Sequence, residues 1–297
     1  MTGCRMKGKI IKGIGGFYYV HDGHSRIFEC RAKGIFRNQN RRPLVGDDVE
    51  FCALEGEEGT GSITALLARR NELLRPAVAN VDQVLMISAA ASPEPSTDLL
   101  DRFLITLEER NVPAILCFNK MDLVSGETEQ TLKEYYQGSG YRLLFFSVAR
   151  EEGLGEIRAL LNGKTSVLAG PSGVGKSSLI NYLLPQANME TGSISTKLGR
   201  GKNTTRHSEL FCLEEGTFIM DTPGFTALSV DTVPADRLAD YFPEFAAAEG
   251  GCRFPDCRHM DEPDCAVKQL VETGKISRGR YQHYRVLFEE CKAKRKY

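Results

Sequence analysis

The sequence predicts a multidomain protein, with a small all-β barrel first, then an α/β domain, and a helical unit at the C-terminal end. Three observations support this fold class. Short alternating strand patterns fill the first 70 residues, strand and helix patterns alternate from residue 81 onward, and three cysteines and a histidine cluster after residue 250. Because 297 residues is long for one compact domain, we expect domains at 1–70, 71–229 and 230–297.

The first 70 residues contain short segments of alternating apolar and polar residues, separated by glycine-rich or polar turns. These segments are residues 7–13, 16–20, 26–32, 47–54 and 61–67. No long helical pattern interrupts them, which favours a small barrel of the oligonucleotide-binding (OB) type. Aromatic side chains lie among the basic residues here, and they could either fill the barrel core or stack on RNA bases. They are Phe17, Tyr18, Tyr19, Phe28 and Phe36.

The next region alternates apolar runs typical of buried strands with helical spacing. We expect strands at 81–89, 112–118, 142–146, 166–169 and 217–220, and helices at 98–110, 130–136 and 154–161. This alternation is typical of a mostly parallel sheet, whose ligands bind at the carboxyl edge of the strands. The motifs described next all follow directly after one of these strands.

A phosphate-binding motif follows the strand at 166–169, where the spacing G-x-x-x-x-G-K-S begins at Gly170. Glycines let backbone amides turn inward around phosphate oxygens. Lys176 can reach the outer phosphates, and the Ser177 hydroxyl is placed to ligate Mg²⁺. The alternative is an ordinary glycine-rich turn. We expect nucleotide contacts from Gly170, Pro171, Ser172, Gly173, Val174, Gly175, Lys176, Ser177 and Ser178.

Two further strands deliver residues that we expect to bind the base. These are Asn119, Lys120, Met121 and Asp122 after one strand, and Ser147, Val148 and Ala149 after another. The Asp122 carboxylate can accept both N–H groups on the guanine edge, whereas adenine would leave it unpaired. Asn119 could bond the base or tie the loops together, and the Lys120 stem could cover the ring. The motif therefore indicates GTP rather than ATP.

The sequence D-T-P-G follows the last predicted strand. Asp221 can hold Mg²⁺ through water, and the Gly224 N–H can meet the terminal phosphate. In the polar stretch G-R-G-K-N-T-T-R-H before it, Thr204 or Thr205 could close over Mg²⁺ and the γ-phosphate, unless this is an ordinary surface loop. The expected magnesium ligands are Ser177, Thr205 and Asp221.

Phe225 follows Gly224, at a position where many small GTPases carry a glutamine that orients the attacking water. A phenyl ring cannot orient water, so hydrolysis must depend on another group or on a partner. We therefore expect slow GTP turnover by the protein alone.

The C-terminal cluster has the spacing C-x₄-C-x-H-x₅-C, from Cys252 through Cys257 and His259 to Cys265. Three thiolates and an imidazole suit one closed, structural Zn²⁺ site, so we assign the cluster no catalytic chemistry. The alternative is four unrelated buried residues. His21, His24 and His283 match no motif, and we expect them to be ordinary surface or core histidines.

The net charge is −1, but both ends are basic: residues 1–46 carry ten Lys and Arg against two acids, and residues 275–297 carry eight against two. This favours a polyanionic partner, although chance clustering on a solvated surface would look the same. No apolar run approaches the roughly 18 residues that a membrane span needs. Because the N-terminus also lacks a signal-peptide pattern, we expect a cytoplasmic protein without a membrane partner.

The motif order is permuted, since N-K-M-D precedes the phosphate loop instead of following it. With a basic barrel before and a Cys/His segment after, the whole chain resembles the ribosome small-subunit-dependent GTPase A family. The resemblance implies GTP hydrolysis stimulated by the small ribosomal subunit, a role in its late maturation, rRNA contact by both flanking domains, and zinc binding. It also implies GTP/GDP as ligands, and we expect a monomer.

One position departs from that family, which commonly has a histidine just before the Thr pair where this chain has Asn203. Asparagine can orient a water but cannot take its proton, and His207 is a possible substitute. The candidates for the catalytic group are therefore Asn203, Thr204, Thr205 and His207.

Two other functions remain open at this point. The phosphate loop also resembles that of guanylate kinases, although the N-K-M-D and D-T-P-G motifs argue against a nucleotide kinase. An RNA-binding scaffold, in which the nucleotide is only structural, would keep the same motifs without turnover.

Overall fold

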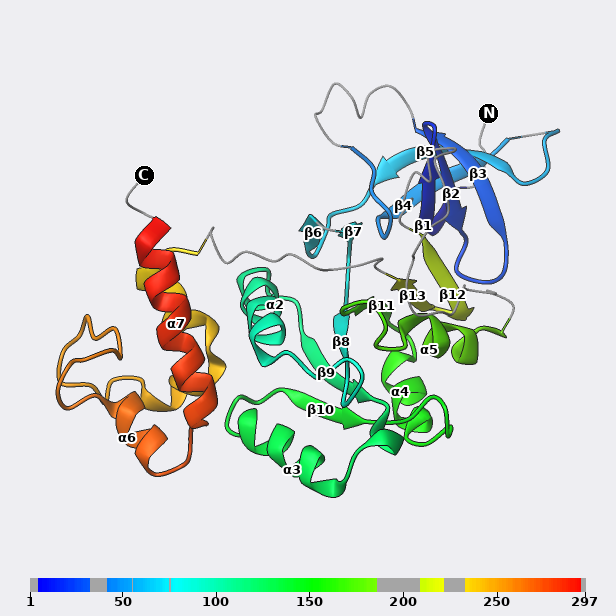
Figure 1. Ribbon diagram of the computed structural model, residues 1–297. Helices are drawn as coiled ribbons and strands as arrows, with labels where there is room; N and C mark the ends of the chain where they lie inside the picture. The colour runs from blue at the N-terminus through cyan, green and yellow to red at the C-terminus, as the bar shows by residue number, and fades with distance from the viewer. Residues whose placement is uncertain are drawn as a thin grey trace, which may run out of the picture.

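The computed structural model describes residues 5–32, 42–54, 56–74, 76–185, 209–221 and 233–294. Figure 1 shows a barrel, a central sheet with helices, and a helical unit that carries the C-terminus. Within these ranges, no helix is both long and apolar enough to cross a membrane.

The N-terminal unit is a barrel, as predicted, and the structure shows that it is closed. Its strands are β1 (Met6–Ile14), β2 (Phe17–His21), β3 (Ile27–Ala32), β4 (Asp48–Ala53) and β5 (Thr60–Leu66). They follow the order β1-β2-β3-β5-β4, and β1 closes the barrel by pairing with both β2 and β4. Alternate residues such as Ile10, Val20 and Phe51 fill the core, because successive side chains on a strand face opposite sides.

The described barrel aromatics differ in burial. Phe28 is buried and packs on Phe51 with ring centroids 5.1 Å apart. Phe17, Tyr18 and Tyr19 are only partly buried. Phe36 lies outside the described residues.

The central unit is a six-stranded sheet in the order β10-β9-β8-β11-β13-β12. Its strands are β8 (Gln83–Ala89), β9 (Ala114–Asn119), β10 (Arg142–Phe145), β11 (Thr165–Ala169), β12 (Leu210–Glu214) and β13 (Thr217–Asp221). Neighbouring strands are parallel except for the antiparallel edge pair β12–β13. Every residue of β8 and β11 is buried, as expected for parallel strands covered on both faces.

Two pairs of helices cover the two faces of this sheet. The helices are α2 (Thr97–Glu109), α3 (Gly126–Tyr135), α4 (Leu154–Leu161) and α5 (Lys176–Leu183), with a short 3₁₀ helix η1 (Met121–Leu123). Helices α2 and α3 share one apolar core with the sheet, and α4 and α5 share the other. The predicted strands and helices of this unit are confirmed to within a few residues, whereas the edge strand β12 was not predicted.

The C-terminal unit packs on α2 and has its own apolar core. Its elements are the 3₁₀ helices η3 (Ala235–Tyr241) and η4 (Pro243–Ala248) and the helices α6 (Ala266–Glu272) and α7 (Arg278–Lys294). Ile105 of α2 is fully buried within this core rather than in the core of the central sheet. A further short hairpin, β6 (Glu72–Leu74) with β7 (Ala77–Ala79), lies between the barrel and the sheet in the chain.

Candidate functional site

The predicted nucleotide-binding residues lie at one edge of the central sheet. Strands β9, β10, β11 and β13 all run parallel to β8 and to one another. Their carboxyl ends therefore meet at that edge. The loops that follow the first three of them carry the predicted guanine and phosphate motifs, and Asp221 ends the fourth. The sheet therefore gathers motifs that are more than 100 residues apart in the chain, from Asn119 to Asp221.

Asn119 connects the three loops. Its side-chain amide donates to the Val174 carbonyl at 2.8 Å, and its side-chain oxygen accepts the Val148 N–H at 3.1 Å. The side chain is 3 % exposed, and a Cβ at Gly175 would come within 2.2 Å of its amide nitrogen. Of the two roles that the sequence left open for Asn119, the structure supports the tie between loops.

Replacing Asn119 by alanine should lower GTP affinity at least tenfold, because it breaks both ties and leaves the buried Val174 carbonyl unpaired. Equilibrium titration with a fluorescent GTP analogue measures this. Asn162→Ala, at the exposed end of α4, is the matched control and should bind normally. Equal affinities for the two variants would contradict the tie.

Asp122 is held by the loop that follows β10. The Ser147 hydroxyl donates to its Oδ1 at 2.5 Å, and Ser147 is itself fully buried and paired with Glu152 through two backbone hydrogen bonds of 3.0 Å. The hydroxyl also accepts the Arg150 N–H at 3.1 Å. The carboxylate is thereby fixed in rotation. This role of Ser147 was not predicted, and only its place after a strand could have indicated it.

Lys120 adopts a left-handed backbone conformation with φ of 65°. Its ammonium group donates to the Ser92 carbonyl in the loop between β8 and α2. This contact anchors the end of the side chain beside the Asn119–Asp122 turn. Met121 adds a backbone bond to the loop after β10, from its N–H to the Phe146 carbonyl at 3.2 Å.

The phosphate loop encloses the Lys176 ammonium, which donates to the Gly170 and Pro171 carbonyls at 2.7 Å each and leaves the residue 8 % exposed. Burial lowers the pKa of Lys176, and the negative charge of Asp221 partly opposes this. The loop requires glycine at its start, since a Cβ at Gly170 would lie 2.0 Å from the Ile87 carbonyl oxygen. Helix α5 begins at Lys176, so its first N–H groups face the loop, as in anion-binding sites.

Two of the three predicted magnesium ligands, Asp221 and Ser177, lie within the described residues. Asp221 ends β13 and lies in register with Leu168, next to the strand that enters the phosphate loop. Ser177 is half-buried in the first turn of α5. Thr204, Thr205, Asn203, His207, Gly224 and Phe225 lie outside the described residues.

The predicted zinc ligands do converge in space. His259 Nδ1 lies 3.6 Å from the Cys252 sulfur and 3.4 Å from the Cys265 sulfur, and those two sulfurs are 4.0 Å apart. With Cys257, all four donor atoms lie within 4.8 Å of one another. A tetrahedral zinc with bonds of about 2.0–2.3 Å requires donor separations of roughly 3.5–3.8 Å, so the cluster fits this ion.

The backbone around the cluster is held by contacts that the sequence did not reveal. Tyr281 and Tyr284 of α7 donate their hydroxyls to the carbonyls of His259 and Arg258, each at 2.7 Å. Glu262 accepts two backbone N–H groups of the same loop at 2.8 and 2.9 Å. The spacing of the two tyrosines, which are three residues apart in the chain, was the available signal.

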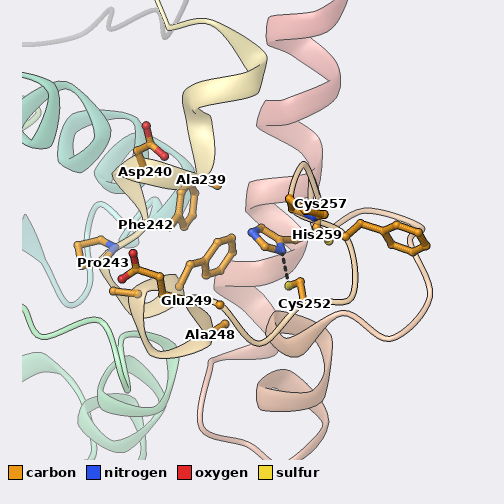
Figure 2. Close-up of a pocket in the computed structure, with 14 residues that line it drawn as sticks. Ala239, Asp240, Phe242, Pro243, Ala248, Glu249, Cys252, Cys257 and His259 are labelled. Atoms are coloured by element: carbon orange, nitrogen blue, oxygen red, sulfur yellow. Dashed lines mark hydrogen bonds between the residues drawn. The ribbon is translucent and has the colours of Figure 1, made fainter.

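Figure 2 shows the pocket beside this cluster, with His259 pointing at Cys252 and the 3₁₀ helices η3 and η4 forming the opposite wall. The His259 ring packs edge-on against Phe245, with centroids 5.6 Å apart. Burial lowers the pKa of His259, which favours the neutral imidazole that binds metal ions. The arrangement is that of a closed structural site.

Comparisons with known proteins cover nearly the whole chain. Family models described as the RsgA N-terminal domain and the RsgA GTPase match residues 7–60 and 66–231. A protein of Agathobacter rectalis named "Small ribosomal subunit biogenesis GTPase RsgA" is 48 % identical, covering 98 % of this chain and all of the relative. One of the same name from Alkaliphilus metalliredigens is 43 % identical, covering 98 % and 99 % of the two chains.

Two solved structures share the fold. The crystal structure of YloQ, described as a circularly permuted GTPase, superposes with a TM-score of 0.82 at 38 % identity and covers 99 % of this chain and 96 % of its own. YjeQ from Thermotoga maritima gives a TM-score of 0.83 at 36 % identity, with coverage of 97 % and 98 %. The predicted permutation and barrel are thus confirmed, and the chain belongs to the RsgA GTPase family.

Proposed function

We propose that this protein hydrolyses GTP and acts as an assembly factor in the late maturation of the small ribosomal subunit. The observation that carries the proposal is the convergence of the guanine and phosphate motifs at one sheet edge, tied together by Asn119. The names of the relatives from Agathobacter rectalis and Alkaliphilus metalliredigens support the ribosomal role.

Each side chain of the site has a defined task in this proposal. Asp122, with its rotation set by Ser147, accepts the two N–H groups of guanine. Lys176 and the amides of the phosphate loop bind the β- and γ-phosphates. Ser177, Thr205 and Asp221 hold Mg²⁺, which supplies positive charge to the phosphates. Zn²⁺ bound by the C-terminal cluster has a structural role only.

The proposed site lacks the residues that usually orient the attacking water. Phe225 follows Gly224, and Asn203 replaces the histidine of the family pattern. Asn203, Thr204, Thr205 and His207 stay candidates for the group that orients it. We propose that basal turnover is slow and that contact with the subunit completes the catalytic arrangement.

The ribosomal partner is proposed to bind through rRNA contacts from both flanking units. Exposed basic side chains on the barrel (Lys7, Arg26, Arg31) and on the C-terminal unit (Lys275, Arg278) support this. Such groups neutralise phosphates, so the affinity should fall steeply with added salt. We also propose that the protein is cytoplasmic and monomeric.

The test is GTP turnover by the purified protein, alone and with small ribosomal subunits. We expect stimulation of at least tenfold by small subunits and none by large subunits. Tighter binding to small subunits with a non-hydrolysable GTP analogue than with GDP is expected as well. Unstimulated turnover, together with equal binding in both nucleotide states, would refute the assembly role.

Guanine selectivity provides a separate prediction. Asp122→Ala should lower GTP affinity by at least about 100-fold, because two charge-assisted hydrogen bonds of roughly 1.5–3 kcal/mol each are lost together while the phosphate contacts remain. Binding of GTP and ATP by titration calorimetry measures the loss of preference. Glu127→Gln, an exposed acid on α3, is the control and should keep the wild-type ratio.

A further inference from the structure

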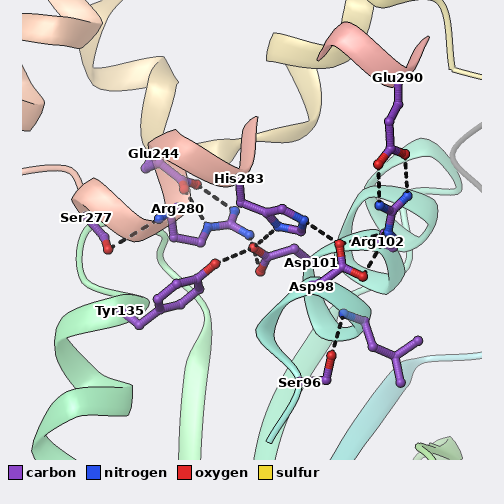
Figure 3. A network of polar contacts seen from close by, with 11 residues as sticks. Ser96, Asp98, Asp101, Arg102, Tyr135, Glu244, Ser277, Arg280, His283 and Glu290 are labelled. Atoms are coloured by element: carbon purple, nitrogen blue, oxygen red, sulfur yellow. Dashed lines mark hydrogen bonds and ion pairs between the residues drawn. The ribbon is translucent and has the colours of Figure 1, made fainter. Parts of the chain in front are cut away.

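A buried ionic network joins helix α2 of the central unit to the C-terminal unit (Figure 3). Arg280 of α7 is 0 % exposed, and its guanidinium donates to Asp101 of α2 at 2.7 Å and to both oxygens of Glu244 on η4, at 2.7 and 3.1 Å. Three elements from two units therefore share one charge centre.

His283 lies one turn further along α7 and bridges two carboxylates of α2. Its Nδ1 is 2.7 Å from Asp101 Oδ2, and its Nε2 is 2.7 Å from Asp98 Oδ1. Ionised carboxylates only accept hydrogen bonds, whereas a neutral imidazole donates from one nitrogen alone. Both contacts can be hydrogen bonds only if both ring nitrogens carry protons.

Other donors also form hydrogen bonds with the two carboxylates. Asp101 also accepts from Arg280 and from the Tyr135 hydroxyl of α3, at 2.7 and 2.9 Å. Burial alone would raise the pKa of Asp98, but hydrogen bonds from Arg102 and His283 outweigh it and lower that pKa. Each carboxylate thus accepts a hydrogen bond from an arginine in addition to its contact with the His283 ring.

The charge balance around His283 also favours a cation. Four carboxylates face only two guanidinium groups in this network: Asp98, Asp101, Glu244 and Glu290 against Arg102 and Arg280. Arg102 of α2 pairs with both oxygens of Glu290 on α7, at 2.8 and 2.9 Å. The two carboxylates that are fully buried, Asp101 and Glu244, face one fully buried guanidinium, that of Arg280. A positive imidazole offsets the remaining buried negative charge, which is costly when uncompensated.

We propose that the C-terminal unit is held on α2 by a proton-dependent contact of His283 with Asp98 and Asp101, which we call the joint. Helix α7 stays packed on α2 only while His283 is positively charged. The same helix holds the Cys/His loop through Tyr281 and Tyr284, so the joint sets where that loop stands relative to the central sheet. This inference does not depend on the ribosomal role proposed above.

The direction of the pH effect follows from the pKa of His283. Burial lowers this pKa, but the hydrogen bonds and charges of Asp101 and Asp98 outweigh burial and raise it above the ordinary 6.5. The stabilisation is complete below the ordinary value and is lost as the pH rises through the pKa of the folded protein. The joint therefore weakens on the alkaline side.

The first measurement is ¹⁵N NMR of the histidine rings in the full-length protein, with His283→Gln used to assign the signal. We expect both nitrogens of His283 to be protonated at pH 7, where an ordinary histidine is mostly neutral. A neutral His283 ring at pH 7 would overturn the proposal.

The second measurement is hydrogen exchange of α7 amides, compared between wild type and His283→Gln at each pH so that the intrinsic exchange rate cancels. At pH 6 the variant should exchange about tenfold faster, the effect typical of losing a hydrogen bond between charged groups. At pH 9 the two proteins should exchange alike. Glu289→Gln, which removes an exposed acid of α7 outside the network, is the control and should exchange like the wild type at both pH values. If the ratio of the α7 exchange rates of wild type and His283→Gln did not change with pH, the proposed joint would be wrong, even if the His283 ring were charged.

Discussion

Replacing Lys176 by alanine is expected to lower GTP turnover by about 10²–10³-fold, the cost typical of removing one preorganised group at developing charge. The Lys176 ammonium lies inside the phosphate loop, on the Gly170 and Pro171 carbonyls. In the proposed function it exchanges these carbonyls for phosphate oxygens when the nucleotide binds. Phosphate release under single-turnover conditions measures the effect, with and without small subunits.

Lys133→Ala is the control, because it removes an exposed ammonium from α3. Basal turnover should be unchanged in that variant. If Lys176→Ala kept more than a tenth of wild-type turnover under both conditions, the phosphate loop would not be the catalytic site and the proposed function would fail with it.

The motifs of the nucleotide site were predictable because their geometry depends on local sequence. At Gly170, where a Cβ would lie 2.0 Å from the Ile87 carbonyl oxygen, and at Gly175, no other residue fits, so the glycine spacing carries the structural information. The zinc cluster has the same property, since its four donors lie within 14 residues. The strands of the central sheet were visible as apolar runs such as Gln83–Ala89.

The contacts between distant segments were not predictable in this way. His283 matched no motif, because its partners Asp98 and Asp101 are more than 180 residues away in the chain. Ile105 is an apolar residue of a helix that packs on the sheet, yet its own side chain is buried in the C-terminal core. Hydrophobic periodicity identifies a buried face but does not identify the element that covers it.

Removing the C-terminal metal should have the largest effect on stability, because binding of structural zinc contributes on the order of 10 kcal/mol of folding free energy in small domains. Cys265→Ser should lower the zinc content from one ion per chain to a trace. Hydrogen exchange over residues 233–294 should increase by more than 100-fold, since Tyr281 and Tyr284 then lose the fixed carbonyls that they contact. Metal analysis and exchange on the same sample measure both effects.

Cys291→Ser is the control for replacing a buried cysteine by serine, because Cys291 is a buried residue of α7 outside the cluster. It should keep its zinc and lose only a modest amount of stability. In the part of the chain that the structure describes, the two apolar cores of the central sheet contain no residue of the C-terminal unit. GTP affinity should therefore survive in both variants even when the unit opens. A Cys265→Ser protein that retained stoichiometric zinc and normal exchange would show that the cluster is not a metal site. One that lost GTP binding would show that the C-terminal unit is part of the nucleotide domain's stability, contrary to the separation of the cores.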